Sequence, residues 1–419
     1  MHKENDFISI RQNVLTWLDS LRVKDANYGV YRFCENGNST ILASCFALFI
    51  RELLNDLSLL SEKERQEWIS YIKSTQDEAT GFFYDPLFNE ADLNGKHDVE
   101  YFIHQNTMFC LSALNALDSE PDYNLQILSS YWDKTVVKDW LDDLDWSNPW
   151  LISNNIMYLM YFLQDDYKRN KSKKSIEILD FIFDYLDQTQ DYKTGFWGTD
   201  KGANIFHGMA GAFHFYFYYF NMQKHVSFNT KIIAHTLALQ NNDGLFTPMG
   251  GGGHCDDLDA IDILVKFSMI SSYRSEDVRQ ALLKAFDQLV KNQNPDGGFC
   301  YAKVPFYSLP DWNYCFRLFF PVENLDYKTR FWMIVRKVGS QVLYPKVKKW
   351  TWKYSSWKLM SCQVNQSDVW STYFRLLAIA LISSRYSEEF SNFPDWKFRD
   401  YGIGWHSHDI GENLKGDLF

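Results

Sequence analysis

The amino-acid sequence predicts an all-α fold, an (α/α)6 toroid in which six helical hairpins form an inner and an outer ring of helices. Two patterns support this prediction. A short phrase of Gln, a polar link, Gly and an aromatic residue returns about every fifty residues. Each phrase separates an amphipathic helix from a more apolar one. A repeat of this length without strand signatures is typical of stacked helical hairpins.

The glycines of the repeated phrase are nearly evenly spaced. One hairpin lacks its glycine, and DDLDWSNPWL (142–151) stands where the phrase is expected. We expect the glycine to end the preceding helix in a left-handed conformation and the Gln to bind backbone groups exposed at the next helix end. We therefore interpret the phrase as structural. It occurs, without the Gln in the first case, as YGVYRF (28–33), QDEATGFF (76–83), QDYKTGFW (190–197), QNNDGLF (240–246) and QNPDGGF (293–299).

The helices on the two sides of each phrase differ in polarity. Helices before it, such as ILDFIFDYLDQT (178–189), carry apolar residues at three- and four-residue steps and are expected in the outer ring. Helices after it, such as HGMAGAFHFYFYYF (207–220), are apolar on most faces and should be buried in the inner ring. We expect one domain over residues 1–419, with an insertion or lid at 302–350 and a polar C-terminal tail at 395–419.

Composition and charge exclude several classes of protein. Hydrophobic residues make up 46% of the chain, which is enough for a large core. A net charge of −11 without a long basic run argues against a nucleic-acid partner. No apolar run reaches the roughly 18 residues of a membrane helix, and the N-terminus lacks a signal-peptide core. The seven cysteines are scattered and lack CxxC spacing, so we expect a cytoplasmic protein with reduced thiols.

The phrases QNPDGGF and QNNDGLF resemble the Gln-x-x-x-Gly-aromatic repeats of the terpenoid cyclases and the protein prenyltransferase β-subunits. The resemblance extends over about five of the six hairpins. It implies a toroid whose aspartate-rich cavity mouth supplies a general acid to a prenyl-type substrate. Similar toroids also serve polysaccharide lyases, glycoside hydrolases and sugar epimerases, so the fold alone leaves the reaction open.

The densest polar cluster, MGGGGHCDDLDAID (249–262), begins an inner helix. One Asp is expected there as a helix cap. Four exceed that need, and clustered carboxylates raise one another's pKa and suit acid chemistry. The predicted catalytic carboxylates are therefore Asp256, Asp257 and Asp259. The resemblance implies Asp256 as the acid, because class II terpenoid cyclases use the middle Asp of Asp-x-Asp-Asp. His254 replaces the first Asp of that motif here.

A second polar cluster, NIFHGMAGAFHFYFYYF (204–220), places His207 and His214 seven residues apart on one helix face. His207 precedes the helix body and is a catalytic candidate, whereas His214 is either a buried core residue or a substrate ligand. No motif requires a cofactor, so the cofactor is unknown, with zinc and magnesium as candidates. The resemblance to prenyltransferases, which bind zinc through Asp, Cys and His, makes Cys255, Asp257 and His207 weak metal candidates.

Other polar and aromatic residues occupy equivalent positions at the starts of inner helices. Amides, charges and Trp side chains favour a sugar, whereas a cavity for a carbocation needs aromatic walls with few hydrogen-bonding groups. A carbohydrate-active toroid that works by carboxylate and His acid–base chemistry is thus an alternative, and a non-catalytic toroid that binds a peptide or glycan is another. The predicted substrate-binding residues are His104, Gln105, Trp150, Asn154, Asn155, His214, His254, Trp370, Tyr373 and Arg375.

Overall fold

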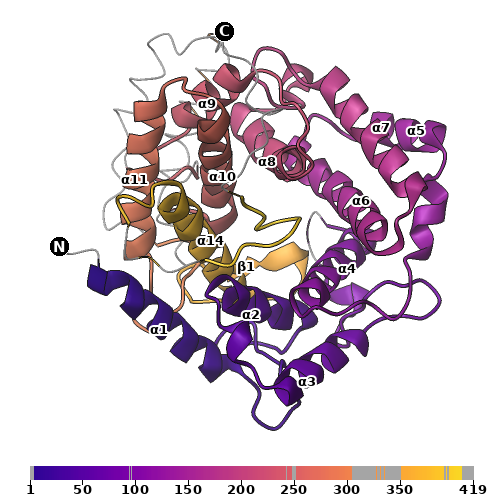
Figure 1. The fold of residues 1–419 in the computed structure, drawn as a ribbon, viewed down its shortest axis with the longest axis vertical. Helices are drawn as coiled ribbons and strands as arrows, with labels where there is room; N and C mark the ends of the chain where they lie inside the picture. The colour runs from indigo at the N-terminus through magenta and orange to yellow at the C-terminus, as the bar shows by residue number, and fades with distance from the viewer. Residues whose placement is uncertain are drawn as a thin grey trace.

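The computed structural model describes the chain at residues 4–93, 95, 97–241, 243–247, 252–303, 327, 331, 335, 351–390, 393 and 396–407. Two concentric rings of helices surround one axis, which confirms the predicted all-α toroid (Figure 1). The inner ring consists of α2 (Ile41–Leu53), α4 (Val99–Ala116), α6 (Pro149–Asn170), α8 (Ile205–Asn221), α10 (His254–Ile270) and α14 (Val369–Arg385). The outer ring consists of α1 (Glu4–Leu21), α3 (Glu62–Lys73), α5 (Lys134–Asp143), α7 (Lys173–Thr189), α9 (Asn229–Ala238) and α11 (Ser275–Lys291).

The inner ring is closed. Each inner helix packs against the next one along the chain, and α14 packs against both α10 and α2. The apolar faces predicted from the sequence explain this arrangement, because α14 is buried from Val369 to Ser383. Most outer helices bury one stripe, as α7 does with Ile178, Ile182 and Leu186, whereas α9 is buried continuously from Ile232 to Leu237.

Gln76, Gln240 and Gln293 each bind two backbone carbonyl oxygens, whereas Gln190 binds that of Gly195 and the Tyr216 hydroxyl. The expected binding to the next helix end needs correction, because Ala281 and Ile10 lie within their helices. Gln240 Nε2 donates to the carbonyl oxygen of Gly244 in its own loop at 2.9 Å and to that of Ala281 on α11 at 2.7 Å. Gln293 repeats the pattern with Gly297 at 2.8 Å and Ile10 of α1 at 3.4 Å. Gln76, Gln240 and Gln293 therefore join their glycine loops to the next outer segment, whereas Gln190 joins its loop to inner helix α8.

The loop glycines adopt left-handed conformations, with φ between 77° and 102° at Gly29, Gly81, Gly195, Gly244 and Gly297. Our expectation that they end the preceding helices needs correction, because α9 ends at Ala238 and α11 at Lys291, several residues earlier.

The glycines are also required by close packing. A Cβ on Gly244 would lie 2.8 Å from the Lys284 carbonyl oxygen of α11. A Cβ on Gly297 would overlap the Asn13 carbonyl oxygen of α1, so the last glycine loop packs against the first helix.

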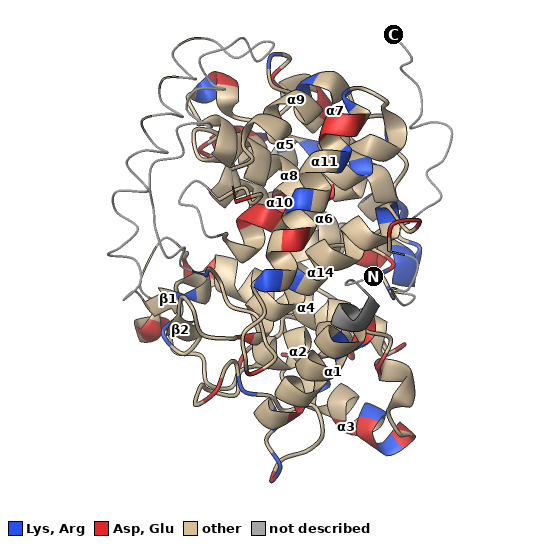
Figure 2. Cartoon of the chain, turned by 90° about the vertical axis from the view of Figure 1, so that its left-hand side faces the viewer, with Lys and Arg blue, Asp and Glu red and all other residues tan. Residues whose placement is uncertain are grey.

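The sequence sets two segments apart from the repeat, residues 302–350 and residues 395–419. Most of the predicted insertion at 302–350 falls outside the described residues. After it, β1 (Thr351–Lys353) pairs antiparallel with β2 (Ser361–Gln363), at one end of the ring in the side view of Figure 2. From the predicted C-terminal tail, residues 396–407 pack against the inner helices, and 408–419 lie outside the described part.

The remaining described elements are short 3-10 helices between the α-helices. They are η1 (Leu57–Leu59), η2 (Glu90–Asp92), η3 (Gln126–Tyr131), η4 (Thr199–Lys201) and η5 (Tyr354–Ser356). Among the described helices, none combines the length and apolar character that crossing a bilayer requires.

We expect Gln240→Ala to destabilise the ring. The substitution leaves the buried carbonyl oxygens of Gly244 and Ala281 without their side-chain donor, which should lower the free energy of unfolding by about 1–3 kcal/mol. Urea denaturation followed by circular dichroism measures this loss. The matched control is Gln280→Ala, because Gln280 is exposed on α11 and its loss should cost less than about 0.5 kcal/mol. Equal losses in the two variants would contradict the structural role of Gln240.

Candidate functional site

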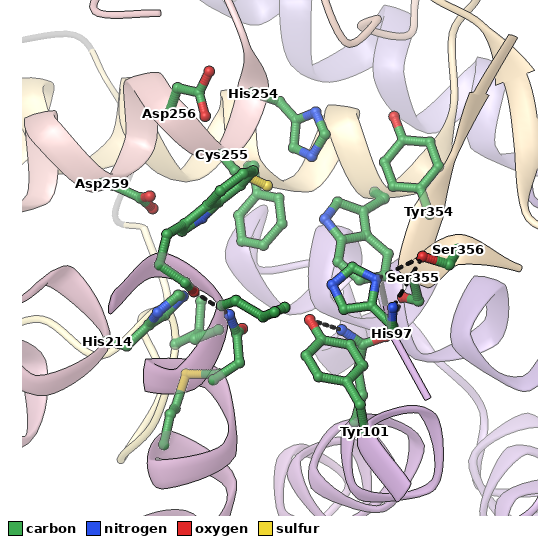
Figure 3. A pocket seen from close by; sticks show the side chains of 18 of the residues that line it. His97, Tyr101, His214, His254, Cys255, Asp256, Asp259, Tyr354, Ser355 and Ser356 are labelled. Carbon is green, nitrogen blue, oxygen red and sulfur yellow. Dashed lines mark hydrogen bonds between the residues drawn. The ribbon is translucent and has the colours of Figure 1, made fainter. Parts of the chain in front are cut away.

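A cavity of about 350 Å³ lies at the N-terminal ends of the inner helices, where the sequence predicted a mouth (Figure 3). Its lining is mixed in character. The aromatic lining residues are Tyr101, Phe109, Trp150, Tyr158, Phe213, Tyr301, Trp352, Tyr354, Trp370 and Phe374. The other polar or charged lining residues are His97, Gln105, Asn148, Asn154, His214, His254, Cys255, Asp256, Asp259, Lys353, Ser355 and Ser356.

Two carboxylates, Asp256 and Asp259, project from α10 into this region (Figure 3). Asp259 is 2% exposed, and its Oδ2 has no hydrogen-bond partner in the described part of the chain. Burial raises the pKa of Asp259 well above its usual range, and the neighbouring Asp256 and Asp262 carboxylates raise it further. Asp259 therefore retains a proton at a pH where exposed carboxyl groups have lost theirs.

Two imidazoles line the same cavity, and burial lowers their pKa values, whereas it raises that of Asp259. Burial lowers the pKa of His214 to about 3, and its Nδ1 lies 2.8 Å from Ser153 Oγ. His254 is 1% exposed and stacks on Tyr354 and Phe374, with ring centroids 5.4 Å and 5.5 Å apart. Burial, and next the nearby Arg375 guanidinium, lower the pKa of His254 well below its usual range. Both rings are therefore neutral, and each has a nitrogen able to accept a proton.

A buried hydrogen-bond chain orients His254. Asp368 caps α14 by accepting from Ser371 N at 2.7 Å, and its Oδ2 also accepts from Ser371 Oγ at 2.7 Å. Because the Ser371 hydroxyl proton points to Asp368, its oxygen can accept from His254 Nδ1 at 3.3 Å. This assigns the proton of His254 to Nδ1 and leaves Nε2 as an acceptor. Nε2 has no hydrogen-bond partner among the residues described here.

A further wall of the cavity is built by Gln105 and the stretch after β1. Gln105 Nε2 donates to Tyr158 Oη at 3.1 Å and to Tyr101 Oη at 3.4 Å, while its Oε1 accepts from Ser355 Oγ. Ser355 and Ser356 both have left-handed backbones, with φ of 52° and 58°. Two such consecutive non-glycine residues cost of order 1–3 kcal/mol each and are typical of functional sites.

Several lining residues carried no signal in the sequence. His97 lies 2.9 Å through Nδ1 from Ser356 Oγ, yet it precedes an inner helix at a position that no motif marks. Trp352 and Tyr354 come from the segment after the repeat is broken. The repeat period could not locate them, because they reach the cavity only through the long-range packing of the β1–β2 hairpin.

Asp257 and Arg375 are not among the cavity lining, although the sequence predicted roles for both in the site. They form a fully buried ion pair, with Arg375 Nη1 2.5 Å from Asp257 Oδ2. Asp257 also accepts from Phe246 N at 2.7 Å and Gly253 N at 3.0 Å, and Arg375 Nη2 donates to the Tyr301 carbonyl oxygen at 2.7 Å. The pair thus joins the segment before α10 to α14.

Four other predicted residues also lie outside the cavity. His104 and Asn155 line a separate space of about 30 Å³. His207 stacks on Trp150 at 5.8 Å, and Tyr373 meets Gly404 below the cavity. The structure does bring together Asp256, Asp259, Gln105, Trp150, Asn154, His214, His254, Cys255 and Trp370.

The predicted metal ligands are distributed over separate places. Cys255 lines the cavity, Asp257 is paired with Arg375, and His207 lies on Trp150. Within the described residues, no group of three His, Cys, Asp or Glu side chains is arranged to hold a metal ion. Burial and the Asp259 carboxylate raise the pKa of the Cys255 thiol, so that thiol keeps its proton.

Comparison with known proteins agrees with this geometry. The chain matches the prenyltransferase alpha-alpha toroid domain over residues 25–144 and 129–306. It therefore belongs to this family, and the resemblance inferred from the repeats is confirmed. A solved polysaccharide lyase is similar over 81% of this chain and 98% of its own, with 11% sequence identity and a TM-score of 0.41. We draw nothing about chemistry from a likeness of this size. No curated protein matches the chain.

We expect Arg375→Met to destabilise the fold by about 3–5 kcal/mol, because it leaves the buried Asp257 carboxylate without its counter-charge. Chemical denaturation measures the change. Arg274→Met is the matched control, since Arg274 pairs with Asp277 at the surface and its removal should cost at most about 1 kcal/mol. A similar small loss in both variants would show that the buried pair is not a structural tie.

Asp368 should make stability fall as pH rises from about 4 to 6. Burial raises the pKa of Asp368 to about 6, whereas the unfolded chain releases this proton near the ordinary value of about 4. The folded state alone binds the proton in that window, so the free energy of unfolding should decrease by up to about 1.4 kcal/mol per pH unit. Denaturation at several pH values should show a flatter slope for Asp368→Asn than for the native chain or the exposed Asp139→Asn control. An unchanged slope in Asp368→Asn would refute this assignment.

Proposed function

We propose that this toroid is a carbohydrate-active enzyme that cleaves a glycosidic bond by general acid–base chemistry. One observation supports this most directly. The same cavity holds a carboxyl group with a raised pKa, Asp259, and two imidazoles with lowered pKa values, His214 and His254. Surroundings that move the pKa values of paired groups apart identify a proton donor and a proton acceptor at the same pH.

The composition of the wall supports a hydroxylated substrate. Gln105 and Asn154 are amides placed on two neighbouring inner helices, and Ser355 and Ser356 add hydroxyl groups from the stretch after β1. Trp150, with Trp352 and Trp370, supplies flat apolar surfaces in the same cavity. Polar groups that fix orientation within an otherwise aromatic cavity suit a sugar, whose ring has apolar faces and a polar rim.

In the proposed reaction, Asp259 donates its proton to the glycosidic oxygen as the bond from that oxygen to carbon breaks. His254 Nε2 accepts a proton, either from a water that attacks the carbon or from a sugar carbon in an elimination. Transfer of the proton from His254 back to Asp259 restores both groups to their starting protonation states. Ser371 and Asp368 are positioning residues in this scheme, because they hold the proton on the other ring nitrogen of His254.

A second candidate is a cyclase that protonates a prenyl-type hydrocarbon. The specific observation in its favour is the number of aromatic rings in the lining, since their faces stabilise cations. Lys353 is the one Lys or Arg among the described lining residues, so ionisation of a diphosphate group has little support there. A purely binding toroid would pair its mouth carboxylates, as Asp257 is paired, whereas Asp259 is in no described ion pair.

We expect Asp259→Asn to lower kcat/KM by about 10²- to 10⁴-fold, the usual contribution of a general acid. The melting temperature should stay the same or rise, because the change removes a buried, unpartnered acid. Release of reducing ends or unsaturated products from oligosaccharides gives the rates. The exposed Asp139→Asn variant serves as the control and should retain native activity.

Substrate class is tested first by thermal shift with a panel of neutral and acidic oligosaccharides and with a polyprenyl diphosphate. A ligand that binds only the native state raises the melting temperature by mass action. Stabilisation by the prenyl compound alone would overturn the carbohydrate proposal and favour the cyclase. Full activity in Asp259→Asn on a responding oligosaccharide would exclude Asp259 as the acid.

A further inference from the structure

We infer that the cavity is blind, that residues 396–407 form its floor, and that the enzyme therefore acts on the end of a glycan chain and not on its interior. This inference rests on the proposed function and specifies its mode of action. We call residues 396–407 the floor segment. It follows α14 in sequence but returns to the inside of the inner ring.

The successive turns of α6 show where the cavity ends. Trp150, Asn154 and Tyr158 line the cavity from the start of the helix downwards. One turn further, Tyr161 stacks on Tyr401 of the floor segment, with ring centroids 5.1 Å apart. Tyr401 Oη then donates to Asp165 at 2.9 Å, near the C-terminal end of α6. The cavity therefore occupies the upper turns of the helix, and the floor segment occupies the lower ones.

Arg399 ties the floor segment to two more inner helices. Its guanidinium donates to Glu52 of α2 at 2.9 Å and to Ser112 of α4. The guanidinium also lies 3.4 Å from the centre of the Phe49 ring. Arg399 and Glu52 are both less than 8% exposed, so this ion pair lies inside the ring.

The remaining three inner helices hold the same segment. Asn221 at the end of α8 donates to the Asp400 carbonyl oxygen at 3.0 Å. Lys266 of α10 lies over the Trp405 ring at 5.6 Å. Trp396 Nε1 donates to Ser383 Oγ, near the end of α14, at 2.9 Å. All six inner helices thus contact the floor segment toward their C-terminal ends.

Ile403 is the residue of the floor segment that lines the cavity. The glycines on both sides have left-handed backbones, with φ of 75° at Gly402 and 95° at Gly404. A Cβ on Gly402 would lie 2.8 Å from the Tyr161 ring, and one on Gly404 would overlap Tyr373 Oη. These two glycines let the backbone lie close to the inner helices while Ile403 faces the cavity.

A closed floor limits how a chain can bind. Cleavage inside a long chain requires the chain to continue on both sides of the catalytic groups, and therefore needs an open groove or two openings. A cavity of about 350 Å³ that ends at Ile403 has room for a chain terminus only. Exo-type release of terminal units should follow.

The test compares linear malto-, cello- and galacturonate oligosaccharides of increasing length with cyclic malto-oligosaccharides. We expect the native chain to release only the terminal unit from each linear substrate that it cleaves. It should leave the cyclic compounds intact, and a bulky fluorophore on one of the two ends should block cleavage. Mixed internal fragments at early times, or cleavage of the cyclic compounds, would overturn the blind-cavity inference and leave the proposed function standing. If no glycan is cleaved or raises the melting temperature, the proposed function fails and this inference fails with it.

Ile403→Ala tests the floor itself. Removing this side chain deepens the cavity. The ratio of kcat/KM for the shortest cleaved oligosaccharide to kcat/KM for the longest should therefore change about tenfold, which is the usual effect of a small change in a pocket wall. The control is Ile178→Ala, a truncation of another buried isoleucine, on outer helix α7 away from the cavity, which should leave that ratio unchanged. An unchanged ratio in Ile403→Ala would show that Ile403 does not bound the substrate site and would overturn the inference.

Discussion

The ring depends on one steric constraint, the close approach of each glycine loop to the next outer segment. Gly244 lies against the backbone of α11, and Gly297 lies against the backbone of α1, where no Cβ would fit. Gln76, Gln240 and Gln293 add hydrogen bonds across the same junctions, as Gln240 does to Ala281. Because outer and inner helices alternate along the chain, the inner helices all begin at one end of the ring. The cavity lies among the first three turns of α4, α6, α8, α10 and α14.

Burial then decides the chemistry of that space. Removing water penalises the charged form of any group, so it raises the pKa of Asp259 and lowers that of His214 within one cavity. Burial also penalises the charged form of Asp257, two residues before Asp259. There the Arg375 guanidinium and two backbone amides stabilise the carboxylate. Two carboxylates on one helix therefore serve different purposes, because Asp259 lines the cavity and Asp257 stabilises the fold. The direction in which each side chain leaves α10 makes the difference.

Two segments outside the repeated hairpins complete the site. The stretch after β1 contributes Tyr354, Ser355 and Ser356 to the wall and holds Gln105 in place from a distant part of the chain. The floor segment closes the opposite end through contacts with every inner helix, among them the buried Arg399–Glu52 ion pair and the buried Tyr401–Asp165 hydrogen bond. A repeat fold thus gains a specific binding space through its non-repeated parts. We interpret the strained backbones of Ser355 and Ser356 as part of this arrangement.

The sequence alone determined the toroid, because glycine spacing and helical periodicity are local patterns that directly reflect helix packing. It also placed Asp256, Asp259, His254, Gln105, Asn154, Trp150 and Trp370 at the mouth, since inner-helix register follows from the same repeat, and left His214 open between core and cavity. Only the tertiary structure decided that Asp257 and Arg375 bind each other, that His104 lies in a separate space, and that Ile403 bounds the cavity. These outcomes depend on side-chain direction and on contacts between segments distant in the chain, 118 residues apart for Asp257 and Arg375, which no local pattern records.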